Sequence, residues 1–281
     1  MSSFTSYDGT TLAYTTVGGG PPLVCLAGGP GFPGRYFDDL AGLGERRTLV
    51  LLDPRGVGHS DLPSDPATLR FDRLAADLEA LRAHLGLETM AVLGHSAGSI
   101  TAQVWAAQHP ASVERLVLLT PSDHLQGGTR ADVAEIRALY ADEPWYAEAV
   151  EAFELIQDAP PSQANALRRA LMPFQYARWD DTAQDHARRM EPLLSKRSQA
   201  GYIAGADEVS FDDHNAALQQ VTAPVLVVAG TRDAVTGSVA AELVASAFPN
   251  AEVAWVEGAG HHPWIDEPVA FRAVVDPFVT L

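Results

Sequence analysis

Short apolar runs with little alternation recur along this chain of 281 residues. Strands buried on both faces of a parallel sheet have this pattern, because both sets of side chains face a core. Two more alternating runs, 5–7 and 11–17, flank Asp8-Gly9, a hairpin turn signal. Together they predict eight strands, with an antiparallel pair at the N-terminus. The runs that predict buried strands are 23–27, 48–52, 90–93, 116–119, 225–229 and 253–256.

Helical patterns lie between several of these runs, at 71–85, 97–109, 239–248 and 268–279. Alternation of strands and helices favours an α/β fold with right-handed crossovers. We therefore predict a mostly parallel eight-stranded sheet flanked by helices, built from residues 1–120 and 222–281.

Residues 121–221 interrupt this alternation. The segment has no strand-like run, is rich in Ala, Glu, Arg, Asp and aromatic residues, and contains several proline breaks. Such a composition predicts several short helices. Ligands bind at the carboxyl edge of open α/β sheets, where this insertion would begin and end. We predict that it forms a helical lid.

Composition narrows the class of protein. The net charge of −17 disfavours nucleic-acid and membrane partners, which are themselves anionic. Cys25, the only cysteine, lies in an apolar run and is expected to be buried. The nine histidines show no HExxH spacing, so we expect no metal and no cofactor. No signal peptide or bilayer-length apolar run is evident, which favours a cytoplasmic protein. The pattern leaves the oligomeric state open.

The most specific motif is Gly94-His95-Ser96-Ala97-Gly98, which reads G-x-S-x-G. It lies between a predicted strand and a predicted helix, the context in which this motif carries a nucleophilic serine. The two glycines remove Cβ atoms that would clash in so tight a turn, and Ser96 is expected to be strained. We predict that Ser96 is the nucleophile and that His95 packs or hydrogen-bonds beside it.

A serine hydroxyl needs a base to take its proton, and the base needs an acid to orient it. His261 lies in a glycine-containing loop after the last predicted strand, and Asp233 follows the strand at 225–229. We predict His261 as the base and Asp233 as the acid. His262 is an alternative base and Asp123 an alternative acid. Asp233 also has the alternative role of a helix cap near residue 239.

The oxyanion of an acyl-transfer intermediate needs fixed N–H donors. Ala97, at the positive N-terminal end of its predicted helix, is one candidate. Gly29, in the run Gly28-Gly29-Pro30-Gly31, is the other, since glycine lets the backbone approach a ligand closely. A phosphate-binding loop is the alternative, but neither GK[ST] nor G-x-G-x-x-G is present.

A second glycine-rich loop reads D-P-R-G-V-G-H-S and follows the predicted strand at 48–52. Its first and third residues, Asp53 and Arg55, are expected to form a buried, oriented pair. We interpret this pair as structural support for the nucleophile turn and not as part of the catalytic machinery.

These motifs resemble the α/β-hydrolase superfamily over almost the whole chain outside the predicted lid. The run 28–31, with Tyr36-Phe37 downstream, and the D-x-R-G-x-G-x-S loop resemble the proline iminopeptidase group of serine peptidases. That group usually reads His-Gly-Gly-Pro-Gly, where this chain has Ala27 in place of the histidine. Its nucleophile turn usually reads Gly-Gly-Ser-Trp-Gly, whereas the turn here is commoner among esterases and lactonases.

The resemblance implies a cofactor-independent serine hydrolase that forms an acyl-enzyme on a small-molecule or short-peptide substrate. It implies the same roles for Ser96, Asp233 and His261, and for the oxyanion donors Gly29 and Ala97. The preferred activity is that of an aminopeptidase on small peptides or amides with a free N-terminus. Alternatives are a carboxylesterase, lactonase or thioesterase, a cofactor-free biosynthetic enzyme, and a non-catalytic ligand-binding member.

In that group, carboxylates of the lid hold the free amine of the substrate. Each candidate here has the alternative of a solvated helix face, and each aromatic residue of the segment either lines a pocket or packs the lid onto the core. The candidate carboxylates are Glu143, Glu148, Glu151, Glu154, Asp207 and Glu208. The aromatic residues are Trp145, Tyr146, Phe174, Tyr176, Trp179 and Tyr202.

Overall fold

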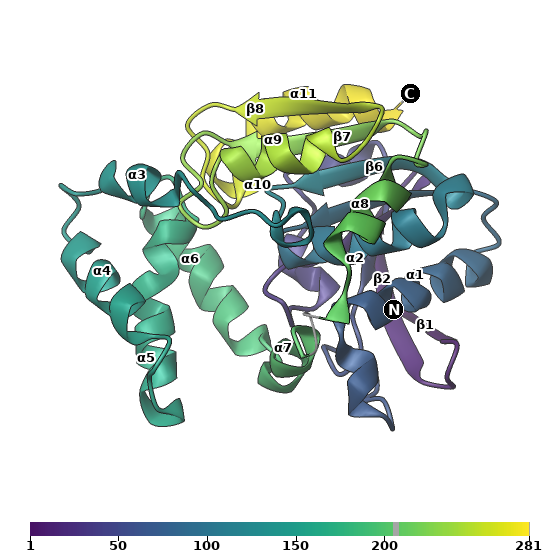
Figure 1. Ribbon diagram of the computed structural model, residues 1–281, viewed down its shortest axis with the longest axis horizontal. Coiled ribbons are helices and arrows are strands. Elements are labelled where there is room, and N and C mark those ends of the chain that lie inside the picture. The colour runs from purple at the N-terminus through teal and green to yellow at the C-terminus, as the bar shows by residue number, and fades with distance from the viewer. Residues whose placement is uncertain (205–207, 281) are drawn as a thin grey trace.

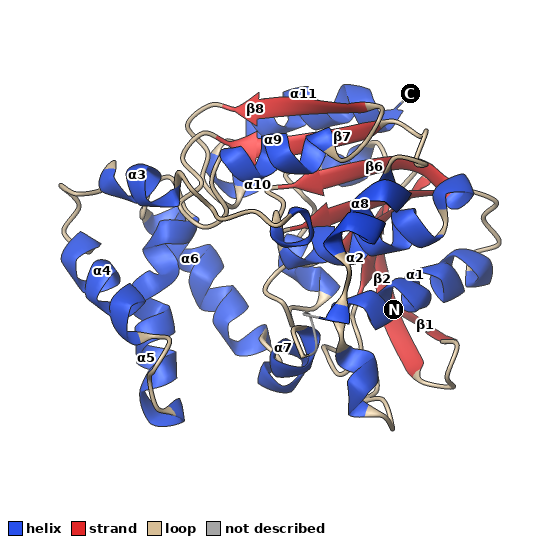
Figure 2. Cartoon of the chain, in the orientation of Figure 1, coloured by secondary structure: helices blue, strands red, loops and turns tan. Residues whose placement is uncertain are grey.

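A sheet of eight strands runs through the computed structural model, which describes residues 1–204 and 208–280, and helices cover both of its faces (Figures 1 and 2). The strand order is β1-β2-β4-β3-β5-β6-β7-β8. The strands are β1 (Ser2–Thr5), β2 (Thr11–Gly18), β3 (Pro22–Leu26), β4 (Thr48–Leu52), β5 (Met90–His95), β6 (Val113–Leu119), β7 (Val225–Gly230) and β8 (Ala251–Val256).

The sheet is mostly parallel, as the sequence predicts. β1 pairs with β2, and β2 with β4, in antiparallel register, and all the pairs from β4 to β8 are parallel. Every residue of β5 and of β7 is buried, which explains why these strands read as unbroken apolar runs. The predicted α/β-hydrolase architecture is therefore confirmed, including its antiparallel N-terminal strands.

The described helices divide into those that cover the sheet and those that follow β6. The first set is α1 (Phe71–His84), α2 (Ala97–Gln108), α9 (Val239–Ser246), α10 (Pro263–Asp266) and α11 (Pro268–Thr280). The second set is α3 (Val133–Ala138), α4 (Tyr146–Leu155), α5 (Pro161–Leu171), α6 (Asp181–Met190), α7 (Lys196–Tyr202) and α8 (Phe211–Leu218). Short 3-10 helices are η1 (Gly34–Phe37), η2 (Leu43–Glu45), η3 (Pro66–Leu69), η4 (Pro110–Ser112), η5 (His124–Gln126), η6 (Met172–Gln175) and η7 (Glu191–Leu193).

Two apolar cores lie on opposite faces of the sheet. One core joins α1, α2, α8 and α9 to the sheet and includes the fully buried Trp105. The other joins η1 and α11 to the opposite face and includes Phe37 and Phe271. Cys25 is buried in this second core, as its apolar surroundings predict. Successive strand residues point to opposite faces, so a buried parallel strand supplies both cores at once.

The helices that follow β6 are where the sequence predicts a lid. Figure 1 shows α3 to α6 beyond the end of the sheet toward which β6 and β8 point, which is the carboxyl edge. α8 differs from them, since it packs on α2 and contributes Leu218 to the first core. The division into a core and a separate lid stays a prediction. Among the described helices, none combines the length and the apolar character that crossing a bilayer requires.

Candidate active site

Ser96 lies in the sharp turn that joins β5 to α2. Its backbone has φ 50° and ψ −118°, a conformation that residues with a Cβ atom rarely adopt. A Cβ at Gly94 would lie 2.7 Å from the carbonyl oxygen of Gly98, and a Cβ at Gly98 would lie 2.2 Å from the carbonyl oxygen of Leu26. The glycines of the motif therefore allow α2 to pack against the strands, and the predicted strain at Ser96 is confirmed.

The turn is fixed by hydrogen bonds on both sides. The Ser96 N–H donates to the carbonyl oxygen of Leu119 on β6 at 3.0 Å. The Ser99 hydroxyl donates to the Ser96 carbonyl oxygen at 2.5 Å. Ala97 is the first residue of α2, so its N–H is one of the amides that have no acceptor within the helix. Such an amide at the positive end of a helix is suited to binding an anion.

Asp233 follows β7 and His261 follows β8, and the fold brings their side chains together. His261 Nδ1 lies 2.9 Å from Asp233 Oδ2, and both side chains are buried. The Asp233 carboxylate also accepts from Val235 N–H at 2.9 Å and from the Thr236 hydroxyl at 2.7 Å. Burial alone would raise the pKa of Asp233, but the charge and hydrogen bond of His261 and the Thr236 bond outweigh it and lower that pKa. The carboxylate is therefore ionised beside the imidazole.

The backbone of the His261 loop is held next to the nucleophile turn. The His261 carbonyl oxygen accepts from Thr120 Oγ1 at 3.1 Å and lies 2.8 Å from His95 Nε2. The two imidazole rings of His95 and His261 are 4.8 Å apart between centroids. Asp266 holds the preceding residue, since its carboxylate accepts from the Gly260 N–H at 2.7 Å. His95 is therefore the predicted hydrogen-bonding neighbour, and it links β5 to the loop that carries His261.

The loop after β3 packs against the same turn. A Cβ at Gly28 would lie 3.0 Å from Ser96 Cβ and 2.7 Å from His95 Nδ1, so only glycine fits there without displacing the turn. Gly29 has φ 115°, a conformation that glycine adopts far more readily than other residues. The loop that carries Gly29 therefore packs against the turn that carries Ser96 and Ala97.

The alternative base, His262, makes different contacts. Its Nε2 lies 3.1 Å from Gln175 Oε1, and its Nδ1 lies 3.3 Å from the Tyr36 hydroxyl. Burial, with smaller contributions from the neighbouring histidines, lowers the pKa of His262 well below its usual value. The imidazole is therefore neutral and committed to structural contacts.

The contacts of Asp123 and Asp233 distinguish the two candidate acids and the capping role predicted as an alternative for Asp233. The carboxylate beside His261 Nδ1 is that of Asp233, while Asp123 packs against Gly128, where a Cβ would lie 1.8 Å from its Oδ2. Asp233 caps the short turn that contains Val235, whereas α9 begins beside Asp132, whose Oδ2 accepts from Ser238 N–H at 2.7 Å. Asp233 therefore combines a local cap with the contact to the imidazole.

Behind His261 lies a buried group of rings that we call the histidine–tyrosine cluster, formed by His95, His186, His262, Tyr36 and Tyr176. The Tyr36 hydroxyl is 3.0 Å from His95 Nδ1, and the Tyr176 hydroxyl is 2.7 Å from His186 Nδ1. The rings of His186 and His262 are 5.2 Å apart between centroids. Since His186 lies on α6, the cluster joins the insertion to the sheet. In the described residues, no group of three or more His, Cys, Asp or Glu is arranged to hold a metal ion.

The prediction that Asp53 and Arg55 pair with each other is wrong. Asp53 accepts from the backbone N–H groups of Gly34 and His59, both at 2.9 Å, and so fixes two loops. Arg55 turns the other way and binds Asp77 on α1 with two hydrogen bonds, at 2.6 and 2.5 Å. Proximity in sequence suggested the wrong partner, because the two side chains, only two positions apart, bind different parts of the fold.

Most of the predicted lid carboxylates lie on solvated faces. Glu143, Glu148, Glu151 and Glu154 are exposed, Glu208 pairs with Arg70, and Asp207 lies outside the described residues. The aromatic residues mainly pack the insertion internally. Trp145, Tyr146 and Phe174 share one apolar cluster, and Tyr176 and Trp179 share another.

Among these six aromatic residues, Tyr202 is the one that belongs to the core on the α1 and α2 face of the sheet. Its hydroxyl donates to the Ala97 carbonyl oxygen, within the first turn of the nucleophile helix. Asp266, Thr236 and Tyr202 all hold groups of the candidate site. Asp266 and Thr236 were not predicted as site residues, and Tyr202 was predicted only as an aromatic residue that lines a pocket or packs the lid onto the core. No motif marks these three residues, because each acts through a contact with a residue that is distant in the chain or through a side chain of common type.

Comparisons with known proteins agree with the fold described above. A family model described as alpha/beta hydrolase fold matches residues 21–268. A proline iminopeptidase of Heyndrickxia coagulans is 24% identical over 278 residues, 93% of this chain and 91% of that protein. One of Levilactobacillus brevis is 27% identical over 262 residues, 90% of this chain and 86% of that protein. The solved structure of an esterase from Exiguobacterium antarcticum has a TM-score of 0.76 at 19% identity, and the match covers 100% of this chain and 99% of that one.

Proposed function

The chain belongs to the α/β hydrolase fold family, and we propose that it is a serine hydrolase whose nucleophile is Ser96. The observation that carries the proposal is the buried hydrogen bond between His261 and an ionised Asp233, in a loop fixed beside the strained turn of Ser96. A strained serine turn next to an imidazole that a carboxylate orients is the arrangement that activates a hydroxyl.

In the proposed reaction, Asp233 accepts a hydrogen bond from His261 Nδ1–H, which leaves Nε2 of the same ring free to accept a proton. His261 removes the proton of the Ser96 hydroxyl as Ser96 Oγ attacks the carbonyl carbon of the substrate. The protonated imidazole then gives this proton to the leaving group, and the bond to that group breaks. Water, activated by His261 in the same way, hydrolyses the resulting ester of Ser96 and releases the acid.

Stabilisation of the tetrahedral intermediate falls to two backbone amides. The Ala97 N–H lies at the start of α2, where the helix dipole adds to the attraction for a negative oxygen. The Gly29 N–H is supplied by the loop that packs on Ser96. The loss of one such donor typically lowers turnover by about 10²–10³-fold.

The preferred substrates are small peptides or amides with a free N-terminus. The two relatives described above, both named proline iminopeptidase, match nearly the whole chain and support this class. A carboxylesterase, lactonase or thioesterase is the second candidate. It is favoured by Ala27 and by the Gly-His-Ser-Ala-Gly turn, which depart from the iminopeptidase motifs, and by the exposure of the described lid carboxylates Glu143, Glu148, Glu151 and Glu154.

Covalent labelling tests the nucleophile. A fluorophosphonate probe is expected to label the protein with one adduct per chain, and peptide mapping should place the adduct on Ser96. Ser96→Ala should abolish labelling, while Ser246→Ala, a change at an exposed serine on α9, should leave it intact. Labelling that persists in Ser96→Ala would refute the assignment.

Paired substrates separate the two candidate activities. Turnover of prolyl p-nitroanilide is expected for the aminopeptidase. Rapid turnover of p-nitrophenyl acetate with no detectable prolyl-amide cleavage would rule out the aminopeptidase and leave the esterase class.

A further inference from the structure

The strand order gives the proposed active site two distinct sides. Ser96 directly follows β5, whereas Asp233 and His261 follow β7 and β8, on one side of that strand. β3 and β4 lie on its other side. In the reaction proposed above, the leaving group must face His261, because this residue supplies its proton. The acyl part of the substrate therefore points toward the carboxyl ends of β3 and β4.

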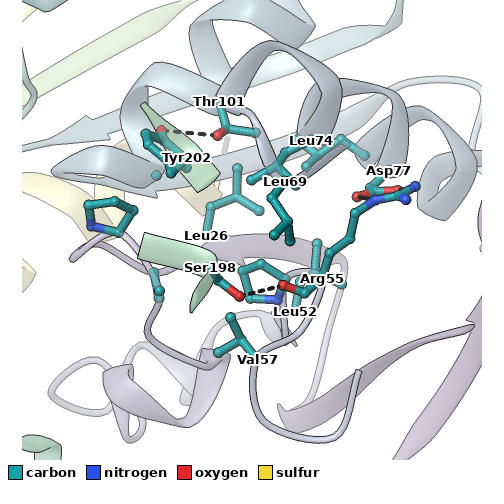
Figure 3. Close-up of a pocket in the computed structure, with 16 residues that line it drawn as sticks. Leu26, Leu52, Arg55, Val57, Leu69, Leu74, Asp77, Thr101, Ser198 and Tyr202 are labelled. Carbon is teal, nitrogen blue, oxygen red and sulfur yellow. Dashed lines mark hydrogen bonds and ion pairs between the residues drawn. The ribbon is translucent and has the colours of Figure 1, made fainter. Parts of the chain in front are cut away.

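A cavity of about 40 Å³ lies on that side (Figure 3). One water needs about 10–15 Å³ of such space, so the cavity holds roughly three waters or an organic group of similar size. Its walls come from β3, β4, η3, α1 and the loop after β4, and they are mainly aliphatic. The apolar side chains that form them include Leu26, Leu52, Val57, Leu69, Leu74 and Leu78.

The cavity borders the two loops that carry the proposed oxyanion donors. Ala27, Pro30 and Gly31, which flank Gly29 in the chain, are part of its wall. So is Gly98, which follows Ala97 on α2. The cavity therefore lies next to the two loops from which the proposed donors come.

The helix α7 forms the roof of the cavity through Ser198 and Tyr202. Figure 3 shows the hydrogen bond from the Ser198 hydroxyl to the Arg55 carbonyl oxygen, which measures 2.9 Å. The Tyr202 hydroxyl donates to the Ala97 carbonyl oxygen, and the N–H of Ser195, just before α7, donates to the carbonyl oxygen of Gly31 at 2.9 Å. These three bonds hold the roof to the edges of the cavity.

One end of the wall is polar, but its two charged side chains are paired with each other. Asp77 and Arg55 lie there, and their side chains bind each other at 2.5 and 2.6 Å. Burial alone would lower the pKa of the Arg55 guanidinium, but the hydrogen bonds that it donates to Asp77 and Asp8 outweigh it and raise that pKa. An ionic group on a ligand would have to compete with this pair, so the cavity favours an uncharged aliphatic group.

We propose that the cavity beneath α7 is the acyl subsite of the enzyme and that it receives a compact aliphatic group, a short chain or a single small ring. The inference rests on the proposed serine hydrolase function, because the direction of the acyl group follows from the role of His261. It adds the size and polarity of the acyl group that the site accepts.

A series of p-nitrophenyl esters tests the subsite. We expect kcat/KM for the butyrate to exceed that for the acetate by about 15-fold, at about fourfold for each buried methylene. The octanoate should be a poorer substrate than the butyrate, because its chain exceeds the cavity, and the succinate monoester should be poorer because of its charge. A rate that rises steadily through the octanoate would overturn the proposal.

Filling the cavity provides the matched variants. Leu74→Phe fills it from α1 and Val57→Phe from the loop after β4, so the failure of one variant to fold leaves the other. Each should lower the ratio of kcat/KM for the butyrate to kcat/KM for the acetate to about 1, because the phenylalanine ring would occupy the volume that the two extra methylenes of the butyrate need. Leu85→Phe, at the C-terminal end of α1 and packed on the same core, should leave the ratio as in the wild type.

The outcomes separate the two proposals. An unchanged butyrate-to-acetate ratio in both filled variants, with the acetate still hydrolysed, would overturn the subsite and leave the serine hydrolase standing. No hydrolysis of any ester or prolyl amide, together with no fluorophosphonate labelling of Ser96, would instead refute the proposed function itself.

Discussion

Two buried carboxylates, each bound to a basic side chain, lie on opposite sides of β5. Asp233 binds His261 at 2.9 Å, beyond β7 and β8. Asp77 binds Arg55 at 2.5 and 2.6 Å, on the side of α1. Both carboxylates are almost fully buried, at 1% and 2% exposure. Their charge and burial are alike, yet we assign only the first pair to the reaction.

The difference lies in the basic partner. The Arg55 guanidinium is fully buried and also contacts Asp8, Thr10 and Thr68, so its donors are committed to the protein. Arginine also keeps its proton throughout the physiological range. His261 uses one ring nitrogen for Asp233, and imidazole exchanges a proton near neutral pH. Burial of a carboxylate is therefore common to both pairs, and our proposal rests on the basic partner, an imidazole in a loop fixed beside a strained serine.

The largest expected effect comes from changing the acid of the first pair. Asp233→Asn should lower kcat/KM by about 10⁴-fold, because an amide in this place favours the wrong tautomer of the imidazole. Steady-state kinetics on the best ester or amide substrate measure the loss.

The control for this prediction is Asp123→Asn, a change at the other buried aspartate considered as the acid. It should retain activity per folded molecule. Loss of activity in Asp123→Asn, with Asp233→Asn still active, would reverse the assignment of the acid.

A change in the second pair, Asp77 and Arg55, should lower the stability of the protein. Asp77→Asn leaves the Arg55 charge buried without its main partner, and we expect a loss of about 3–5 kcal/mol in the free energy of unfolding. Urea denaturation followed by circular dichroism measures this change. Asp185→Asn, which removes an exposed partner of Arg189, should leave the denaturation midpoint unchanged. A midpoint equally unchanged in Asp77→Asn would show that the network of Arg55 contributes nothing to stability.

The smallest expected effect is a dependence of stability on pH that comes from His186, in the histidine–tyrosine cluster. Unlike the guanidinium of Arg55, this imidazole can gain or lose a proton within the accessible pH range. Burial lowers the pKa of His186 to about 4 from its ordinary 6.5, and the nearby charges of Asp38 and Arg189 act in opposite directions. The unfolded chain therefore binds this proton first, so the free energy of unfolding is highest above pH 6.5 and falls as the pH drops toward 4. The difference corresponds to up to about 3 kcal/mol.

Denaturation of the wild type and of His186→Gln at several pH values between 7 and 4 measures this effect. Because glutamine does not titrate, the variant should lose less stability on acidification than the wild type. Parallel curves for the two proteins over this range would show that His186 does not contribute to the acid sensitivity.

The sequence alone determined the features that depend on neighbouring residues. The apolar runs specified the sheet, since a parallel strand buried on both faces needs apolar residues at every position. The turn at Ser96 was also readable, because the glycines on either side are required by contacts within the turn and with the adjacent strand. The order of Ser96, Asp233 and His261 along the chain completed the prediction of the site.

Only the tertiary structure decided which distant residues meet. It joined Arg55 to Asp77 and not to Asp53, directed His262 to Gln175 while His261 faced Asp233, and placed Tyr202 of α7 on Ala97. The physical reason is that periodicity and turn chemistry act over a few residues, whereas partners of buried polar groups are selected by where whole elements pack. A buried polar group must find a partner, but its type alone does not say which one.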